Sequence, residues 1–378
     1  MKIAILGLGT VGSGVYEGAQ KLSGMEVRRI LDRHLRTKIS TCSIEDILGD
    51  PEIELIAETM GGLHPAYEYA RAALTSGRHF VTANKQLVSA YGAELAELAR
   101  QSGAAFLYGA ACGGGIPYLY NLEMARKTDR VTALGGILNG TTNYILDAMT
   151  TRGADYDAVL REAQALGYAE RDPSSDVDGL DTMRKLVLAC AVGFGVFVRE
   201  EEIPVFGISR VLPEDIAHAA RLGCVLKLCA HAENGADGLS ARVEPALVRL
   251  SAPEAAIHQN LNYAWYLGEG CGAMRFSGQG AGKLPTASNV LRDIASVSSG
   301  HRAMTDENCR PVPVRGDAAQ RYYLRVPAGA PVTAAWIETR QTEGAFDFIK
   351  TVPVPVQAMH AFANQEPRAF FAGIERGL

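Results

Sequence analysis

The sequence lacks the features that would assign it to a membrane, to nucleic acid or to an oxidising compartment. No apolar run reaches the length of a membrane-spanning helix, since even the stretch 186–198 stops at thirteen residues. The net charge is -5 and no long basic stripe is present, which argues against nucleic acid as the main partner. The seven cysteines are scattered, odd in number and without a CxxC pair, so they predict reduced thiols and no zinc site. These absences predict a soluble protein of the reducing cytoplasm.

The length and composition predict a multidomain enzyme. With 378 residues, of which 47% are hydrophobic and 21% charged, the chain can form two domains and a small appendage. The N-terminal apolar stretch after Lys2 could also be read as a signal peptide. That interpretation fails because glycines interrupt the apolar core and no credible cleavage site follows.

The first residues predict a dinucleotide-binding turn. A short apolar run ends at Leu6 and breaks into a GxGxxG turn that continues as a helix-like segment. In such a turn the first glycine permits the bend, the second lets the backbone approach a pyrophosphate, and the third lets helix and strand pack closely. The predicted cofactor-binding residues of the turn are Gly7, Gly9, Thr10, Val11 and Gly12.

A second strand-like run ends at Leu31 and is followed by a residue that could select the cofactor. Asp32 could accept hydrogen bonds from adenosine ribose hydroxyls, which favours NAD. Arg33 opens a basic cluster that could hold a 2′-phosphate, which favours NADP, or could simply be a solvated loop. The sequence leaves the choice between NAD and NADP open.

Strand-like and helix-like runs alternate through the first 130 residues, and this pattern predicts a Rossmann-type, doubly wound parallel sheet in an α/β protein. The expected strands lie near residues 2–6, 26–31, 53–59, 79–83 and 104–108. Ligands bind such sheets at the carboxyl ends of the strands, so we expect ligand loops at 7–12, 58–62, 82–85 and 110–117. A strand over 131–138 then leads into a second, α+β domain, which we expect to be catalytic and dimerising.

The segment from Ala163 to Lys185 is rich in carboxylates and leads into a helix, and it is the predicted centre of the chemistry. Asp181 and Lys185 are four residues apart and therefore share one face of that helix, where a carboxylate can orient an ammonium. Taken singly, these acids could equally form a solvated loop. An EF-hand calcium loop is excluded, because the glycine stands at the fourth position and Val187 at the twelfth.

Six motifs together give the chain a dense resemblance to the homoserine dehydrogenase family. They are GLGTVG from Gly7, TANK ending at Lys85, GGGIP at 113–117, NGTTNY at 139–144, AxxxGYAExDPxxDVxGxDxxxK at 163–185, and GQGAGKLPTA ending at Ala287. The resemblance covers about the first 300 residues, and the run 163–185 is its most specific part. It implies NAD(P)-dependent interconversion of L-homoserine and L-aspartate 4-semialdehyde, a branch step of threonine, methionine and isoleucine biosynthesis.

The resemblance also implies roles for individual residues. Lys185 matches the family's proton-transferring lysine, Asp181 its neighbouring acid, and Lys85 a second lysine near nicotinamide and substrate. The residues implied for cofactor and substrate contacts are Thr59 at the nicotinamide ribose, Glu170 at the substrate ammonium, and Asp176 and Tyr168 in the same wall. The implied domains are 1–130 plus 283–306 for the dinucleotide, 131–282 for substrate and homodimer contacts, and a tail at 307–378.

The family binds a monovalent cation, sodium or potassium, through backbone carbonyls, which here would be those of Cys112, Gly114 and Ile116. This chain has Gly109 where the family usually has glutamate, so we expect a cation site that is weakened or dispensable. Cys112 also suggests a rival enzyme class, a semialdehyde dehydrogenase with a thiolate nucleophile, although a buried structural thiol is the simpler interpretation. A catalytically silent nucleotide-binding regulator is a third alternative, opposed by the retained acids and lysines.

The C-terminal 72 residues after position 306 carry the weakest signal. The stretch 321–326 resembles the first strand of an ACT amino-acid-sensing domain, with further strands expected at 334–339 and 346–352. The usual helix start of that domain is replaced, so a packing or dimer-stabilising tail is the favoured alternative to a threonine sensor. No aspartate kinase segment is present, and we expect a monofunctional enzyme.

Overall fold

The chain forms two compact units, each built from three separate stretches. The computed structural model describes residues 1–34, 37–306 and 309–374. The first unit comprises Met1–Val131, Val187–Glu200 and Tyr266–Val312, and the second comprises Thr132–Leu186, Glu201–Trp265 and Pro313–Leu378.

The first unit contains a six-stranded sheet with the order β3-β2-β1-β4-β5-β6, and all of its pairings are parallel. Its strands are β1 (Lys2–Leu6), β2 (Glu26–Leu31), β3 (Ser40–Thr41), β4 (Leu55–Glu58), β5 (His79–Thr82) and β6 (Phe106–Leu107). The prediction of a doubly wound parallel sheet is therefore confirmed. The expected strand at 104–108 is shorter than the pattern suggested.

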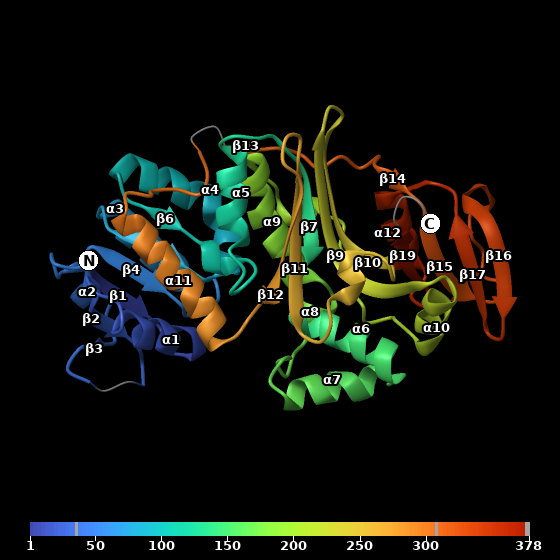
Figure 1. Ribbon diagram of the computed structural model, residues 1–378, viewed down its shortest axis with the longest axis horizontal. Coiled ribbons are helices and arrows are strands. Elements are labelled where there is room, and N and C mark those ends of the chain that lie inside the picture. The colour runs from blue at the N-terminus through green and yellow to red at the C-terminus, as the bar shows by residue number, and fades with distance from the viewer. Residues whose placement is uncertain (35–36, 307–308, 375–378) are drawn as a thin grey trace. The chain divides into compact units, whose positions relative to one another are not determined.

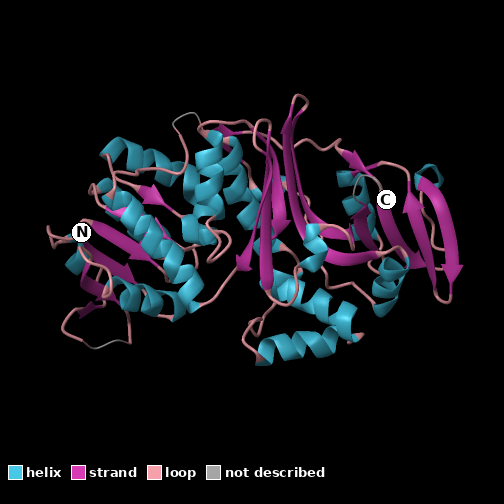
Figure 2. Ribbon diagram, viewed as in Figure 1, coloured by secondary structure: helices cyan, strands magenta, loops and turns pink. Residues whose placement is uncertain are grey.

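Helices connect these strands and cover the sheet (Figures 1 and 2). They are α1 (Thr10–Ala19), α2 (Glu45–Leu48), α3 (Ala66–Thr75) and α4 (Lys85–Ser102). Helix α1 packs against α11 (Lys283–Ser298), and α3 packs against α4. The β1 residues from Ile3 to Leu6 are fully buried, as expected for a strand whose sheet is covered on both faces. The unit also contains α5 (Tyr118–Arg126) and the strands β8 (Val196–Phe197), β12 (Gly272–Gln279) and β13 (Arg310–Pro311).

The second unit contains a mixed sheet in which strands follow the order β11-β7-β9-β10-β19-β15-β17-β16. Their bounds are β7 (Val131–Ile137), β9 (Cys224–Gly235), β10 (Gly238–Arg249), β11 (Leu261–Gly268), β15 (Tyr322–Pro327), β16 (Ile337–Glu343), β17 (Phe346–Thr351) and β19 (Phe370–Ile374). A separate pair joins β14 (Ala319–Gln320) to β18 (Val354–Pro355). The helices are α6 (Gly140–Arg152), α7 (Tyr156–Ala165), α8 (Ser174–Val177), α10 (Pro213–Arg221), α12 (Val356–Gln365) and the start of α9 (Leu180–Phe194).

The C-terminal strands extend this sheet directly. Strand β19 pairs in parallel with β10, through Ala246 with Gly373 and Leu247 with Ile374. A fully buried ion pair then fixes the segment to α10, with Arg325 Nε 2.8 Å from Asp215 Oδ1. The expected strand at 334–339 differs from the structure, because 334–336 form a 3-10 turn and β16 begins only at Ile337.

Helix α9 ends earlier than its apolar sequence suggests. The apolar run 186–198 continues beyond the helix, but α9 stops at Phe194, because Gly195 adopts a left-handed φ of +69°. Val196 and Phe197 then form β8, which pairs with β13 in the first unit. Apolar content alone does not distinguish the end of a buried helix from a short buried strand.

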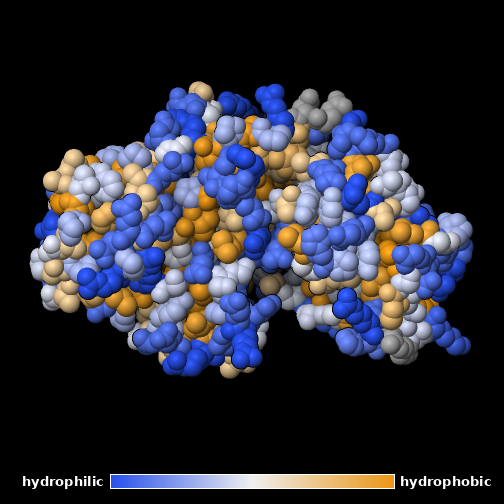
Figure 3. All heavy atoms as spheres, turned by 180° about the vertical axis from the view of Figure 1, so that it is seen from behind, coloured by the Kyte–Doolittle hydropathy of each residue, from blue (hydrophilic) through white to orange (hydrophobic). Residues whose placement is uncertain are grey.

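No helix in the described ranges is long and apolar enough to cross a membrane. On the face drawn in Figure 3, hydrophilic side chains are interspersed with hydrophobic ones and are not separated from them by a continuous apolar band.

Candidate active site

The first turn of α9 carries a buried ion pair. The Nζ of Lys185 lies 2.8 Å from Oδ2 of Asp181, one helical turn away. The two residues are 7% and 3% exposed. Lys185 Nζ also donates a hydrogen bond to the carbonyl oxygen of Leu138, 2.6 Å away, directly after β7. The ammonium is therefore fixed both by its own helix and by the end of a strand.

Asn139 joins this pair to the acidic loop. Its Nδ2 donates to Asp181 Oδ2 at 2.8 Å and to Asp176 Oδ1 at 2.7 Å. Its Oδ1 accepts from the amide of Thr142 at 2.8 Å and so caps α6. Because the cap occupies Oδ1, the amide can only turn Nδ2 towards the two carboxylates. One asparagine thus holds the start of α6, helix α8 at Asp176 and the start of α9 together.

Two residues of this network were not among the predicted site residues. Asn139 lies in the NGTTNY motif, and its position before a helix marks it as a capping residue, which is the signal that could have found it. Asn262 is fully buried in β11, and its Nδ2 donates to the same Leu138 carbonyl at 2.8 Å. A single asparagine within a strand gives no local signal of this kind.

Tyr168 and Glu170 lie in the loop between α7 and α8, and both are exposed. The loop backbone is fixed, since the Tyr168 carbonyl accepts from Thr141 Oγ1 at 2.6 Å and the Glu170 carbonyl from Gln164 Nε2 at 3.1 Å. Neither side chain hydrogen-bonds to Lys185 within the described part of the chain. The loop therefore presents these two side chains to solvent from a fixed backbone.

The glycine turn of the first unit follows β1 and leads into α1. Gly7 has φ +85°, and a Cβ added to Gly12 would lie 2.0 Å from the Gly7 carbonyl oxygen and 2.6 Å from Thr59 Oγ1. A Cβ on Gly9 would meet no atom within 4 Å. Gly9 precedes Thr10 and Val11, and α1 begins there with no side-chain cap among the described residues. Uncapped helix amides beside open space fit the phosphate groups of a dinucleotide.

Asp32 and Thr59 hold the turn in place. Asp32 is half-buried, and its carboxylate accepts the amide of Leu8 at 3.0 Å and that of His34 at 2.8 Å. Thr59 Oγ1 donates to the Gly7 carbonyl at 2.8 Å. Arg33 is exposed beside them. The carboxylate that follows β2 therefore helps to hold the glycine turn in its shape.

Glu58, at the end of β4, is a fully buried carboxylate that sequence reasoning did not select as a site residue. It accepts the amides of Met60 at 2.7 Å and Gly61 at 3.0 Å, and the hydroxyl of Thr82 at 2.5 Å. Burial raises its pKa. Glu58 thereby joins the loops after β4 and β5, and the second of these loops leads to Lys85, the half-buried first residue of α4.

The loop between β6 and α5 contains the carbonyls considered for a cation. Cys112 is fully buried, as the simpler interpretation of this thiol expects. The carbonyls of Gly114 and Ile116 both accept hydrogen bonds from Nδ2 of Asn289. Within residues 1–34, 37–306 and 309–374, no group of three or more His, Cys, Asp or Glu residues could hold a metal ion.

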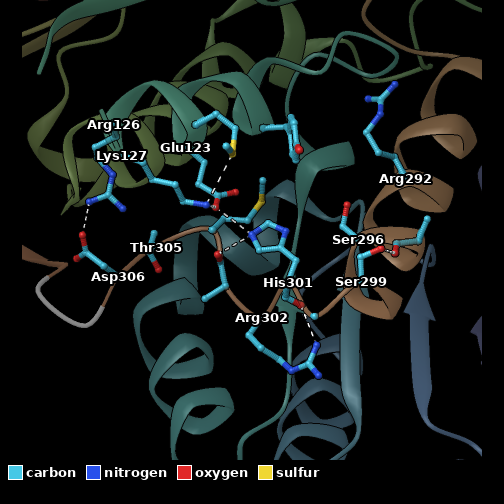
Figure 4. Close-up of a pocket in the computed structure, with 16 residues that line it drawn as sticks. Glu123, Arg126, Lys127, Arg292, Ser296, Ser299, His301, Arg302, Thr305 and Asp306 are labelled. Atoms are coloured by element: carbon cyan, nitrogen blue, oxygen red, sulfur yellow. Dashed lines mark hydrogen bonds and ion pairs between the residues drawn. The ribbon is translucent and has the colours of Figure 1, made fainter. Parts of the chain in front are cut away.

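A separate basic pocket of about 820 Å³ lies in the first unit, between α5 and the end of α11 (Figure 4). None of the predicted site residues lines it. His301 Nε2 lies 3.0 Å from Glu123 Oε1, and Lys127 Nζ lies 2.7 Å from the same oxygen. The hydrogen bond to Glu123 raises the pKa of His301.

A parallel sheet with a glycine turn that fits a dinucleotide, in a chain that also carries a buried lysine–carboxylate pair, is the arrangement of an NAD(P)-dependent oxidoreductase. The comparisons with known proteins make this assignment specific. The family model "Homoserine dehydrogenase, NAD binding domain" matches residues 7–109, and the model "Homoserine dehydrogenase" matches residues 117–295.

Individual relatives agree with these models. The homoserine dehydrogenase of Synechocystis sp. is 42% identical over 341 residues, covering 85% of this chain and 78% of that protein. The Bacillus subtilis enzyme of the same name is 38% identical, covering 80% of this chain and 74% of that protein. The crystal structure of a homoserine dehydrogenase from Thiobacillus denitrificans superposes with a TM-score of 0.90 at 30% identity, covering 99% and 98% of the two chains. The chain belongs to the homoserine dehydrogenase family.

Proposed function

We propose that this protein interconverts L-homoserine and L-aspartate 4-semialdehyde with NAD(P), a branch step of threonine, methionine and isoleucine biosynthesis. The observation that carries the assignment of roles is the buried Lys185–Asp181 pair, held by Leu138 and Asn139. The family assignment argues against both alternatives, a thiolate-dependent semialdehyde dehydrogenase and a silent regulator.

Lys185 is the proposed proton-transferring group. An ammonium has three donors, and two of them are directed to Asp181 and to the Leu138 carbonyl, which leaves one for a substrate oxygen. Held by these two contacts, Lys185 can donate a proton to the alkoxide that develops as the aldehyde is reduced. In the reverse direction the same nitrogen accepts the hydroxyl proton. NAD(P), held by the glycine turn, would supply the hydride to the aldehyde carbon or accept it from the alcohol carbon.

The substrate's amino-acid end is the proposed ligand of the acidic loop. Glu170 would bind the substrate ammonium, and Asp176 and Tyr168 would form the neighbouring wall. The exposure of Tyr168 and Glu170 on a fixed backbone supports this role, because a ligand-binding side chain must be accessible before the substrate arrives. The hydrogen bond from Asn139 to Asp176 supports placing the wall beside the lysine pair.

The proposed cofactor-binding residues are those of the glycine turn, with Asp32 and Arg33 at the adenosine ribose and Thr59 and Lys85 at the nicotinamide end. Asp32 accepts two backbone amides directly after β2, at the carboxyl end of a strand where the ribose of a dinucleotide binds in such sheets. The exposed guanidinium of Arg33 could bind a 2′-phosphate. Both cofactors therefore belong in the assay.

Further proposals concern the organisation of the protein. We place dinucleotide binding in the first unit, and substrate binding and homodimer contacts in the second. We propose a cytoplasmic enzyme in which any monovalent cation bound by the carbonyls of Cys112, Gly114 and Ile116 is weak or dispensable. The pairing of β19 with β10 and the buried Arg325–Asp215 pair support a packing role for the C-terminal segment.

The decisive experiment is the absorbance change at 340 nm with purified protein, L-homoserine and either NAD or NADP. Homoserine-dependent reduction is the expected result, and the two cofactors give the preference in the same experiment. In Lys185→Ala we expect turnover to fall about 10²–10⁴-fold, the usual contribution of a positioned proton-transfer group. Full turnover in that variant would contradict the role of Lys185.

Lys227 provides the matched control for this substitution. It is a second buried lysine of the same unit, 2% exposed, and its Nζ donates to Asn143 Oδ1 at 2.9 Å and to the Ile257 carbonyl at 2.6 Å. We expect Lys227→Ala to lower the Tm but to retain turnover per folded molecule. An equal loss of turnover in both variants would indicate a general effect of removing a buried lysine.

A further inference from the structure

Two residues of α11 hold the loop between β6 and α5 at both of its ends. Asn289 is 2% exposed, and its Nδ2 donates to the carbonyl of Gly114 and, at 3.1 Å, to that of Ile116. One helical turn further, the carboxylate of Asp293 accepts the amide of Gly109 at 2.7 Å. The two side chains are four residues apart and therefore lie on the same face of the helix.

The orientation of the Asn289 amide is fixed by a neighbour. Arg292 donates from Nη1 to Asn289 Oδ1. A guanidinium has donors only, so the atom facing it must be the amide oxygen, and the nitrogen must face the carbonyls. Figure 4 shows Arg292 projecting from α11 away from the His301–Glu123 pair. Arg292 is thus directed to the asparagine and not to the acid of that pocket.

Asp293 explains why position 109 is a glycine. A Cβ on Gly109 would lie 2.7 Å from Oδ1 of Asp293. Any larger residue there would force the carboxylate away from the amide that it binds. Gly109, which is the reason for expecting a weak cation site, is therefore also the position where α11 approaches the loop closely.

Carbonyl oxygens that converge on one point need a positive partner, and two kinds of partner can satisfy them. One is a monovalent cation, and the other is an NH₂ group, which has two hydrogens to donate. Here the amide nitrogen of Asn289 already lies within hydrogen-bonding distance of both carbonyls. A cation bound between the same two oxygens would overlap that nitrogen, so the residues present do not fit a bound sodium or potassium ion.

We propose that the Asn289 side-chain amide, oriented by Arg292, replaces a monovalent cation in ordering the 109–116 loop, so that this protein needs no sodium or potassium. The inference rests on the proposed function only for the expectation of a cation. Asn289 is then a positioning residue, which acts through the loop and not on the substrate.

The first test compares the full-length wild-type protein in NaCl, KCl and choline chloride at equal ionic strength. We expect the same Tm, within about 1 °C, and the same homoserine-dependent turnover in all three salts. Tm is measured without substrate or cofactor, so its outcome does not depend on whether the proposed activity is correct. A Tm or a turnover that rises specifically with sodium or potassium would overturn the proposal.

The second test converts the donor to an acceptor. In Asn289→Asp a carboxylate faces two carbonyls, which is unfavourable without a cation and attractive to one. We expect Tm in choline chloride to fall by about 5 °C and to recover at least in part in NaCl or KCl. A variant as stable as the wild type in choline chloride, or one that sodium and potassium fail to restore, would contradict the proposal.

Asn121→Asp is the matched control. Asn121 also donates its side-chain amide to a backbone carbonyl nearby, that of Pro117 at 2.7 Å, but to one carbonyl only. We expect no cation-specific recovery there, and an equal recovery in both variants would indicate a general salt effect and overturn the proposal.

If Asn289→Asp does not fold, the variant Asn289→Ala tests the proposal instead. It leaves both carbonyls without their donor, so its Tm should rise more with sodium or potassium than with choline, and no such rise overturns the proposal.

Discussion

The glycine turn of the first unit and the lysine pair of the second unit are built in opposite ways. The turn consists of backbone that is held by other backbone groups and by short side chains, all within the first 59 residues. Its key positions are glycines, where a Cβ is absent. The lysine pair consists of charged side chains of α9, fixed by Leu138 and Asn139, which lie more than forty residues earlier in the chain. The glycine turn should therefore lose nucleotide binding when a side-chain atom is added. The lysine pair should lose activity when a charge is removed.

The largest expected effect tests the first half of this comparison. In Gly12→Ala the new Cβ would lie 2.0 Å from the Gly7 carbonyl oxygen, so the turn must deform. We expect the dissociation constant for NAD(P), measured by calorimetry, to rise about a hundredfold or more, together with a lower Tm. Gly9→Ala is the matched variant, since its Cβ meets nothing within 4 Å. It should keep the wild-type Tm and weaken only nucleotide binding, and unchanged binding would remove Gly9 from the cofactor site.

The next effect tests the second half. Asp181→Asn keeps the shape of the side chain but removes the charge beside Lys185, leaving a buried ammonium without its counter-ion. We expect kcat to fall by about tenfold to a hundredfold with little change in nucleotide affinity. Asp178→Asn changes an exposed carboxylate of the same segment and should leave kcat unaltered. Equal losses in both variants would mean that the net charge of the loop matters and the individual pair does not.

A smaller effect is expected at the substrate's ammonium. Glu170→Gln removes one exposed charge from the loop, so we expect the KM for homoserine to rise about tenfold while kcat stays within about twofold. Glu214→Gln, on the exposed side of α10, serves as control. A fall in kcat at constant KM would place Glu170 in the chemistry of the transition state and not in substrate binding.

The smallest effect concerns stability against pH. Burial raises the pKa of Asp293 to about 7. A carboxyl whose folded-state pKa is raised stabilises the protein fully below its unfolded value near 4, and that stability is lost as pH rises towards 7. We therefore compare the Tm of the wild type with that of Asp293→Asn at each pH. The wild-type Tm minus the variant Tm should become about 5 °C smaller between pH 5 and pH 8. A difference that stays constant over this range would show that Asp293 titrates normally.

Much of the first unit could be predicted from the sequence, because its signals are local. The alternating runs and the turn from Gly7 to Gly12 identify the parallel sheet, and β1 and β2 have the predicted bounds. The four-residue spacing also predicted that Asp181 and Lys185 share one helix face, where they form an ion pair. Asn262 and Glu58 could not be identified in this way, since their roles depend on partners that only the folded chain brings near them.

The end of a helix could not be predicted where helix and strand are both compatible with the same residues. Val196 and Phe197 read as the end of a buried helix, yet they form β8, because Gly195 ends α9 and β13 offers a partner more than a hundred residues away in the chain. The orientation of Asn289 is equally invisible in the sequence. Its neighbours in the helix are known, but the carbonyls that it binds lie in a distant segment.

The interleaving of the two units has a consequence for synthesis on the ribosome. The glycine turn emerges first, but its unit also requires 187–200 and 266–312, and a Cβ on Gly14 of α1 would come within 2.8 Å of Ala287 in α11. At roughly 5–20 residues per second, the turn is exposed for roughly 15–55 s before α11 is available to pack against α1. The glycine turn is therefore synthesised well before its unit can reach its final structure.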